Sequence, residues 1–112
     1  MNPDFIDLLR AFIDAKVRFL VVGAYALALH GRPRATGDLD VWIEATPENG
    51  VPPGRIDILT ELTGLTFAEA WTGRLGRPFG DVEVDFIGRE AFIRNKRATG
   101  RPKDLGDIDG LE

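Results

Sequence analysis

Residues 19–44 read FLVVGAYALALHGRPRATGDLDVWIE, and this stretch decides the fold that we expect. A β-branched and aromatic run at residues 18–22 ends at Gly23, and residues 24–30 are rich in Ala and Leu. This order predicts a strand, a tight turn and a helix. Apolar and acidic residues then alternate over residues 38–44, which is the period of a strand with one buried face.

Two aspartates one residue apart, Asp38 and Asp40, lie in that alternating segment. Because successive side chains of a strand point to opposite faces, both carboxylates project from the same face. Carboxylates this close repel each other unless protons, solvent or a cation separate them. Mg²⁺ commonly takes one or two carboxylates together with substrate phosphates, so the pair indicates phosphoryl chemistry. Taken alone, alternating acids are more often the exposed side of an edge strand.

A third carboxylate would let the site hold two divalent ions about 3.5 to 4 Å apart. We select Asp57, because apolar residues flank it in a strand candidate at residues 55–60. A Pro- and Gly-rich loop joins this strand to the previous one, and so short a link predicts an antiparallel neighbour. The acids of a further alternating strand remain an alternative source of the third ligand: Asp81, Glu83 and Asp85.

Candidate phosphate contacts precede the carboxylates in the chain. Gly23 and Ala24 stand at the predicted turn from strand to helix, where small residues let backbone N–H groups approach phosphate oxygens. Arg34 and Thr36 add side-chain donors just before the acidic pair. These four residues are therefore candidate contacts to phosphate oxygens.

The remaining periodicities predict one α+β domain over residues 1–112. The other predicted helices cover residues 2–13, a segment that begins with the capping box of Thr66, and residues 90–98 and 102–111, which are separated at Gly100. Residues 73–80 have the composition of a plain connection. We therefore expect a mixed, mostly antiparallel sheet of three to five strands, with helices mainly on one face.

Composition bounds the class of protein. The chain has 112 residues, of which 44% are hydrophobic and 29% charged, as in an ordinary single globular domain. It has no cysteine, which excludes disulfides and thiolate sites. Neither a secretion signal nor a membrane-spanning segment is expected, and the cytoplasm is the default compartment. The net charge of −4 argues against general coating of nucleic acid, although basic residues gather between Arg94 and Lys103.

Together these motifs resemble the DNA polymerase β-like nucleotidyltransferases. Their signature is an apolar residue, then Gly, then Gly or Ser, a spacer, and Asp-x-Asp or Asp-x-Glu. The corresponding residues here are Val22-Gly23-Ala24 and Asp38-Leu39-Asp40. Residues 23–38 and the closing NKRATGRPKD of residues 95–104 are similar to the AbiEii-type toxin nucleotidyltransferases and their small uncharacterised relatives within that superfamily.

The resemblance implies a reaction and a site. It implies transfer of a nucleoside monophosphate from a nucleoside triphosphate to a hydroxyl of RNA or protein. The metal, Mg²⁺ or Mn²⁺, would be held by Asp38, Asp40 and Asp57, and Asp57 would also be the base.

The same resemblance implies wider contacts. Gly23 and Ala24 would contact the triphosphate, and Lys96 and Lys103 would face phosphates or the acceptor. It also implies a toxin–antitoxin setting with a cognate partner protein.

An alternative function follows from two departures. The segment between Asp40 and Asp57 is shorter than in that family, and Ala24 replaces the usual Gly or Ser. The alternative is a shortened, catalytically inactive nucleotidyltransferase fold that acts as a binding or assembly module, for example as a homodimer. Among single residues, we expect His30 to cap a helix and Trp42 to be a buried anchor.

Overall fold

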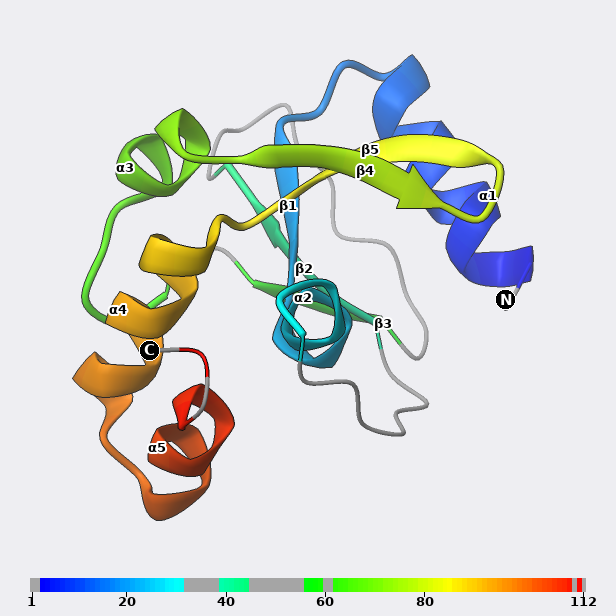
Figure 1. Ribbon diagram of the computed structural model, residues 1–112. Coiled ribbons are helices and arrows are strands. Elements are labelled where there is room, and N and C mark those ends of the chain that lie inside the picture. Colours follow the sequence, from blue (N-terminus) through cyan, green and yellow to red (C-terminus); the bar gives the residue numbers. More distant parts are fainter. Residues whose placement is uncertain (1–2, 32–38, 45–55, 60–61, 110, 112) are drawn as a thin grey trace.

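Five helices and five strands make up the part of the chain that the structure describes (Figure 1). The computed structural model describes residues 3–31, 39–44, 56–59, 62–109 and 111, and for residues 3 and 56–59 only the backbone. The elements in chain order are α1 (Pro3–Asp14), β1 (Phe19–Val22), α2 (Gly23–Leu29), β2 (Leu39–Ile43), β3 (Ile56–Leu59), α3 (Phe67–Thr72), β4 (Leu75–Phe79), β5 (Val82–Phe86), α4 (Arg89–Thr99) and α5 (Pro102–Ile108).

The strands form one mixed sheet in the order β3-β2-β1-β5-β4. The β1–β2 and β4–β5 pairs are antiparallel, whereas the β1–β5 and β2–β3 pairs are parallel. The α+β class and the mixed sheet are thus confirmed, but antiparallel pairs do not predominate. The predicted antiparallel pairing of β3 with β2 is wrong. Residues 44–55 join these strands, and a connection of about a dozen residues suffices for the crossover that parallel strands need.

β4 is a strand that the sequence pattern does not predict, because it lies in the supposed connection at residues 73–80. Gly76 and Pro78 lower the β propensity of this segment. Pro78 is tolerated because β4 is an edge strand of the sheet. Phe79 pairs with Val82, so the two residues between them close a hairpin. The first of the two, Gly80, has a φ of +64°, in the left-handed region that glycine adopts without steric cost.

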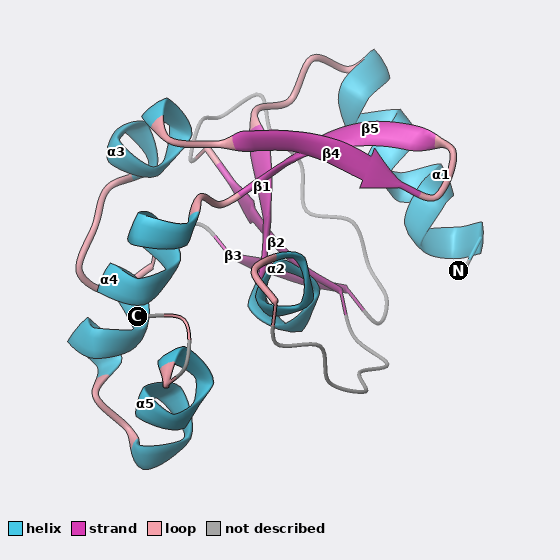
Figure 2. Ribbon diagram, viewed as in Figure 1, coloured by secondary structure: helices cyan, strands magenta, loops and turns pink. Residues whose placement is uncertain are grey.

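Helices cover both faces of the sheet (Figure 2). Strand register places Phe19 and Phe79 on the face opposite to Trp42. On the first face, Phe12 of α1 packs on Phe19 and Tyr25 of α2 packs on Phe79, with ring centroids 5.4 and 5.1 Å apart. On the second face, the ring of Phe67, the first residue of α3, packs on Trp42, with ring centroids 5.2 Å apart. The expected gathering of helices on one face therefore holds for α1 and α2, while α3 covers the other.

The C-terminal helices meet at a glycine cap. Gly100 has a φ of +67° and donates its N–H to the carbonyl of Lys96 at 3.0 Å, which ends α4. Pro102 then begins α5, since proline suits the first turn of a helix. The predicted break at Gly100 is confirmed. In the described residues, no helix has the length and apolar character to cross a bilayer.

Candidate functional site

The turn from β1 into α2 is built on Gly23. Its φ of +68° lies in the left-handed region, where a side chain would strain the backbone. A Cβ at this position would also lie 2.9 Å from Cγ of Asp40 and closer still to Oδ2. Glycine at position 23 therefore allows the Asp40 carboxylate to lie directly against the turn.

Strand register explains why Asp40 is at this place. It pairs with Val22, the last residue of β1, in the antiparallel β1–β2 pair. β2 is an interior strand of the sheet, and each of its residues except Asp40 is buried. Trp42, the other β2 residue on the Asp40 face, is only 1% exposed. Asp40 is thus a partly buried carboxylate on an apolar strand and does not belong to the exposed side of an edge strand.

The position of Asp57 is the second feature of the site. In the parallel β2–β3 pair, the Cα of Asp57 is the partner of the Cα of Asp40. Neighbouring strands lie about 4.7 to 4.9 Å apart, so the two backbones are adjacent. The side chain of Asp57 lies outside the described residues, as do Asp38, Arg34 and Thr36 entirely. Ala24, the residue after the turn, is buried.

The alternative acids of β5 and its hairpin lie elsewhere. Asp81 is paired with Arg10 of α1, and Asp85 Oδ2 lies 3.7 Å from Nε of Arg74. Phe86 is the partner of Val21 in the parallel β1–β5 pair, so Asp85 lies across from the β1 residue before Val21. The β1 partner of Asp40 is the residue after Val21. β1 also separates the two strands. Register therefore favours position 57 over these acids as the neighbour of Asp40.

Among the described side chains, no group of three or more His, Asp or Glu converges in a way that could hold a metal ion. Asp38 and Asp57, two of the three predicted ligands, are not among those side chains. The three-carboxylate site therefore stays a prediction. The structure describes the position of Asp40 and of the backbone at residue 57.

The two C-terminal lysines differ in their surroundings. Nζ of Lys96 lies 3.5 Å from Oδ1 of Asp104 and 3.9 Å from Oδ2 of Asp107, and both acids are buried. Lys96 therefore joins α4 to α5 through ion pairs. Lys103 is exposed on α5. Contact of either lysine with a phosphate remains a prediction, and the structure gives Lys96 a role in packing that the motif alone did not indicate.

Asp104 is the centre of this helix–helix junction. It accepts hydrogen bonds from Thr99 Oγ1 at 2.7 Å and from Arg101 Nε at 2.6 Å. The hydrogen bond from Arg101 holds the pKa of Asp104 well below its usual range, outweighing burial, which alone would raise it. Thr99 and the charge of Lys96 lower the pKa further. The sequence signal was the spacing of Arg101 and Asp104, three residues apart across the start of a helix.

Two single-residue predictions are confirmed. His30 is the C-cap of α2, and its Nε2 donates to the carbonyl of Ile87 at 2.9 Å, which ties α2 to the segment between β5 and α4. Trp42 is a buried anchor. Both residues hold together elements around the Gly23 turn.

Comparison with known proteins gives no family assignment for this chain. No protein-family model, no curated protein and no solved structure matches it. The β1–β2–β3 register brings a glycine turn and two acidic positions, 40 and 57, to one place in the sheet.

Proposed function

We propose that this chain is a metal-dependent nucleotidyltransferase that moves a nucleoside monophosphate from a nucleoside triphosphate to a hydroxyl of RNA or protein. The observation that carries the proposal is the contact of the Asp40 carboxylate with the Gly23 turn. The register of Asp57 with Asp40 supports it. The motif resemblance described above supplies the reaction class.

The donor set fits a hard divalent cation. Asp38, Asp40 and Asp57 offer only carboxylate oxygens, which Mg²⁺ and Mn²⁺ prefer. When bound there, the cation would neutralise charge on the triphosphate and on the leaving pyrophosphate. The β1–β2 register and the contact with the turn fix the position of Asp40, which supports this role.

The remaining roles belong to the chain itself. Because Gly23 has no side chain, the backbone N–H groups of the turn and of Ala24 donate hydrogen bonds to the triphosphate beside Asp40. Asp57 accepts the proton of the attacking hydroxyl, whose oxygen bonds to the α-phosphorus as the bond to pyrophosphate breaks. Arg34, Thr36 and the two C-terminal lysines are proposed phosphate or acceptor contacts.

The proposal includes a biological setting. Nucleoside triphosphate and Mg²⁺ are both abundant in the cytoplasm, which is the compartment we propose. Regulation by a cognate partner in a toxin–antitoxin pair belongs to the same proposal, on the strength of the motif resemblance alone.

Transfer of label tests the enzyme. The purified chain is incubated with each α-³²P nucleoside triphosphate, Mg²⁺, total RNA and total protein, and labelled acceptors are separated on a gel. We expect transfer that Asp40→Asn lowers by a factor of about 10³ or more, since a metal ligand is lost. Asp7→Asn, at an exposed acid of α1, is the matched control and should retain activity. Equal transfer by Asp40→Asn and the wild type would refute the assignment.

The second candidate function is an inactive binding or assembly module, favoured by the short connection of residues 44–55 between β2 and β3. A thermal-shift experiment separates the two. The enzyme should melt at a higher temperature with Mg²⁺ and at least one triphosphate, and Asp40→Asn should lose this rise. No rise with any of the four triphosphates, together with a homodimer in analytical ultracentrifugation, would favour the module.

A further inference from the structure

The end of α2 is joined to β1 by two hydrogen bonds in series. His30 is the C-cap of α2, and its Nε2 lies 2.9 Å from the carbonyl oxygen of Ile87. A carbonyl oxygen only accepts, so the ring nitrogen donates. Ile87 is 1% exposed, and it donates its own N–H to the carbonyl of Val21 at 3.0 Å. A single buried residue therefore connects the side chain of His30 to the strand that enters the Gly23 turn.

These two bonds close a ring around the Gly23 turn. The chain leaves β1 after Val22, passes through Gly23 into α2, and is tied back to β1 at His30. A helix of seven residues is marginal in isolation, so its position depends on tertiary contacts. Val22, the N-cap of α2, makes no side-chain hydrogen bond to it. His30 thus adds a directional contact at the end of α2 to the apolar packing of the helix.

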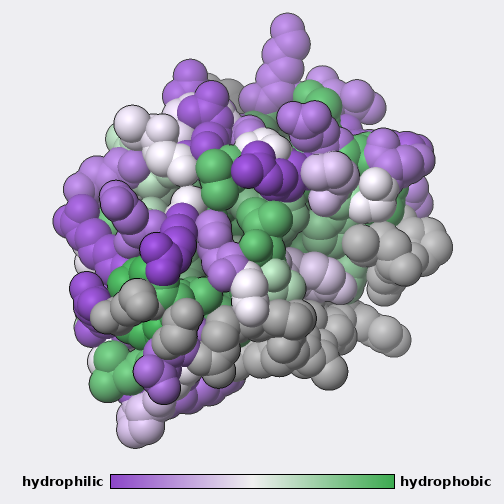
Figure 3. Space-filling model, viewed as in Figure 1, coloured by the Kyte–Doolittle hydropathy of each residue, from purple (hydrophilic) through white to green (hydrophobic). Residues whose placement is uncertain are grey.

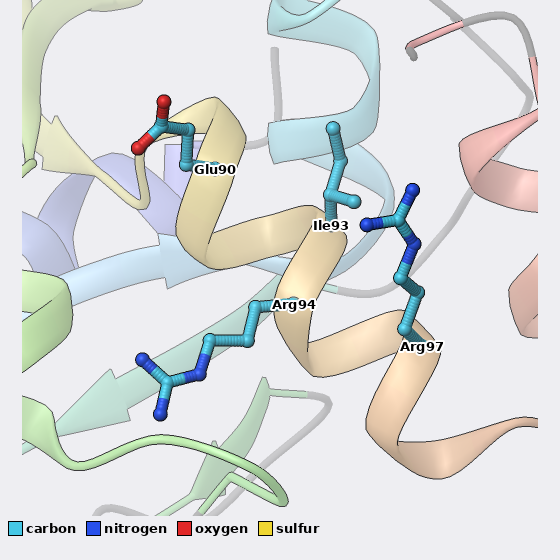
Figure 4. Close-up of a pocket in the computed structure, with 4 residues that line it drawn as sticks. All are labelled: Glu90, Ile93, Arg94 and Arg97. Carbon is cyan, nitrogen blue, oxygen red and sulfur yellow. The ribbon is translucent and has the colours of Figure 1, made fainter.

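The imidazole of His30 also packs on the inner side of α4. Its ring centroid lies 6.2 Å from that of Phe92, which is 2% exposed. A hollow along α4 is lined by four described residues: Glu90, Ile93, Arg94 and Arg97 (Figure 4). Successive helical residues are about 100° apart, which places these four on the opposite side of α4 from Phe92. Hydrophobic and hydrophilic side chains lie side by side over α4 and α5, at the left of Figure 3. The contact with His30 therefore belongs to the apolar interior and not to this mixed surface.

His30 also stands at the start of a segment that carries proposed site residues. After Gly31 the described chain resumes at Leu39, directly before Asp40. The residues between these points include three members of the proposed nucleotide site: Arg34, Thr36 and Asp38. The β1–β2 register fixes the end of this segment at Asp40. The hydrogen bond of His30 fixes the point from which the segment departs.

We propose that His30 is a positioning residue of the nucleotide site, an inference that rests on the proposed function. Its hydrogen bond to Ile87 holds the end of α2, and with it the start of the segment that carries Asp38, in a fixed place relative to Asp40. In-line transfer depends on such placement, because the reacting groups must be aligned. In this role His30 contacts neither the triphosphate nor the metal and transfers no proton.

Label transfer by three variants of His30 tests this role. His30→Gln keeps an N–H donor at a similar reach, His30→Met has a similar length without a donor, and His30→Asn has its donor one methylene short. The kcat is measured with saturating triphosphate and Mg²⁺, well below the melting temperature of each variant. We expect kcat to fall by a factor of about 10 to 100 in His30→Met and His30→Asn, the cost of a misplaced reacting group. His30→Gln should restore kcat close to the wild-type value.

Asn95→Leu is the matched control for loss of a structural hydrogen bond. Nδ2 of Asn95 donates to the carbonyl of Thr63 at 2.9 Å, which ties α4 to the segment before α3 and not to α2. This variant should have a lower melting temperature and an unchanged kcat.

Three outcomes would overturn the role of His30: wild-type kcat in His30→Met and His30→Asn, a low kcat in folded His30→Gln, or an equal fall in Asn95→Leu. Absence of transfer by the wild type is a different result, because it refutes the proposed function and removes the role of His30 with it. Thermal denaturation checks that each variant is folded at the assay temperature. If His30→Met does not fold, His30→Asn provides the comparison with His30→Gln.

Discussion

Aspartate has different surroundings in two regions of this molecule, the Gly23 turn between β1 and α2 and the α4–α5 junction. Asp104 is 1% exposed and is surrounded by the side chains of Thr99, Arg101 and Lys96. Asp40 is partly exposed and lies against a residue that has no side chain. The carboxylate of Asp104 is hydrogen-bonded and ion-paired within the fold, whereas that of Asp40 is the one that we propose as a metal ligand.

The difference shows how to read acidic motifs. A carboxylate surrounded by the protein's own donors stabilises the fold, because its charge is already compensated. A carboxylate placed against a glycine turn has a fixed position, which a binding site requires. Both motifs stand out in the sequence, and only their surroundings distinguish them. Substitutions at matched positions in the two regions test this contrast.

The largest effect is expected from Gly23→Ala, compared with Gly100→Ala. Both glycines have nearly the same positive φ, +68° and +67°. At Gly100 a Cβ would meet only the carbonyl of Arg97, at 3.6 Å, so the backbone strain stands alone and costs about 1 kcal/mol. At Gly23 the methyl group also displaces Asp40, and we expect a loss of about 3 kcal/mol and of nucleotide binding. Urea denaturation measures both variants, and equal losses would contradict the contact.

Asp104→Asn should come next. Asparagine removes the carboxylate charge that Lys96 and Arg101 share and replaces one acceptor oxygen by a donor NH2, so we expect a loss of about 2 to 3 kcal/mol in the free energy of unfolding. Asp40→Asn should cost less than about 1 kcal/mol, because its carboxylate is partly exposed. The same denaturation experiment compares the two. A larger loss in Asp40→Asn would reverse the roles assigned here.

Lowering the pH should reduce the difference in the free energy of unfolding between the wild type and Asp104→Asn. The pKa of Asp104 is lower in the folded state than its unfolded value of about 3.9, so the unfolded state binds more protons as the pH falls. The stability from Asp104 is therefore complete above about pH 5 and is lost progressively below about pH 4. Urea midpoints at pH 6 and pH 3 should show the difference shrinking. A constant difference would mean that the Asp104 charge contributes nothing.

The smallest change in stability is expected from substitutions of the two lysines, which should differ from each other. Lys96→Gln removes the ion pairs to Asp104 and Asp107 and should cost about 1 kcal/mol. Lys103→Gln, at an exposed position, should change stability by less than about 0.5 kcal/mol. If Lys103 faces phosphate or acceptor, its substitution lowers transfer activity with the melting temperature unchanged. An equal melting temperature for Lys96→Gln and the wild type would contradict the packing role.

Local signals predicted much of the fold. The β1–Gly23–α2 succession, the capping box of Thr66 and the helix break at Gly100 all depend on neighbouring residues, and all are present. β4 was missed because its Gly and Pro content is that of a loop, and only pairing with β5 makes it a strand. The parallel pairing of β3 was missed because strand direction depends on the path of the intervening connection, which composition does not define.

In the candidate site, too, some features could be predicted from the sequence and others depend on the tertiary structure. The sequence by itself determined that a glycine turn precedes an Asp-x-Asp strand and that a basic, acid-containing motif closes the chain, since these are short-range patterns of residue type. Tertiary structure alone decided that Asp40 lies on Gly23, that position 57 is beside it, and that Asp104 is buried. The reason is physical: strand register and helix packing join residues distant in the chain, and a carboxylate takes its role from the groups that surround it.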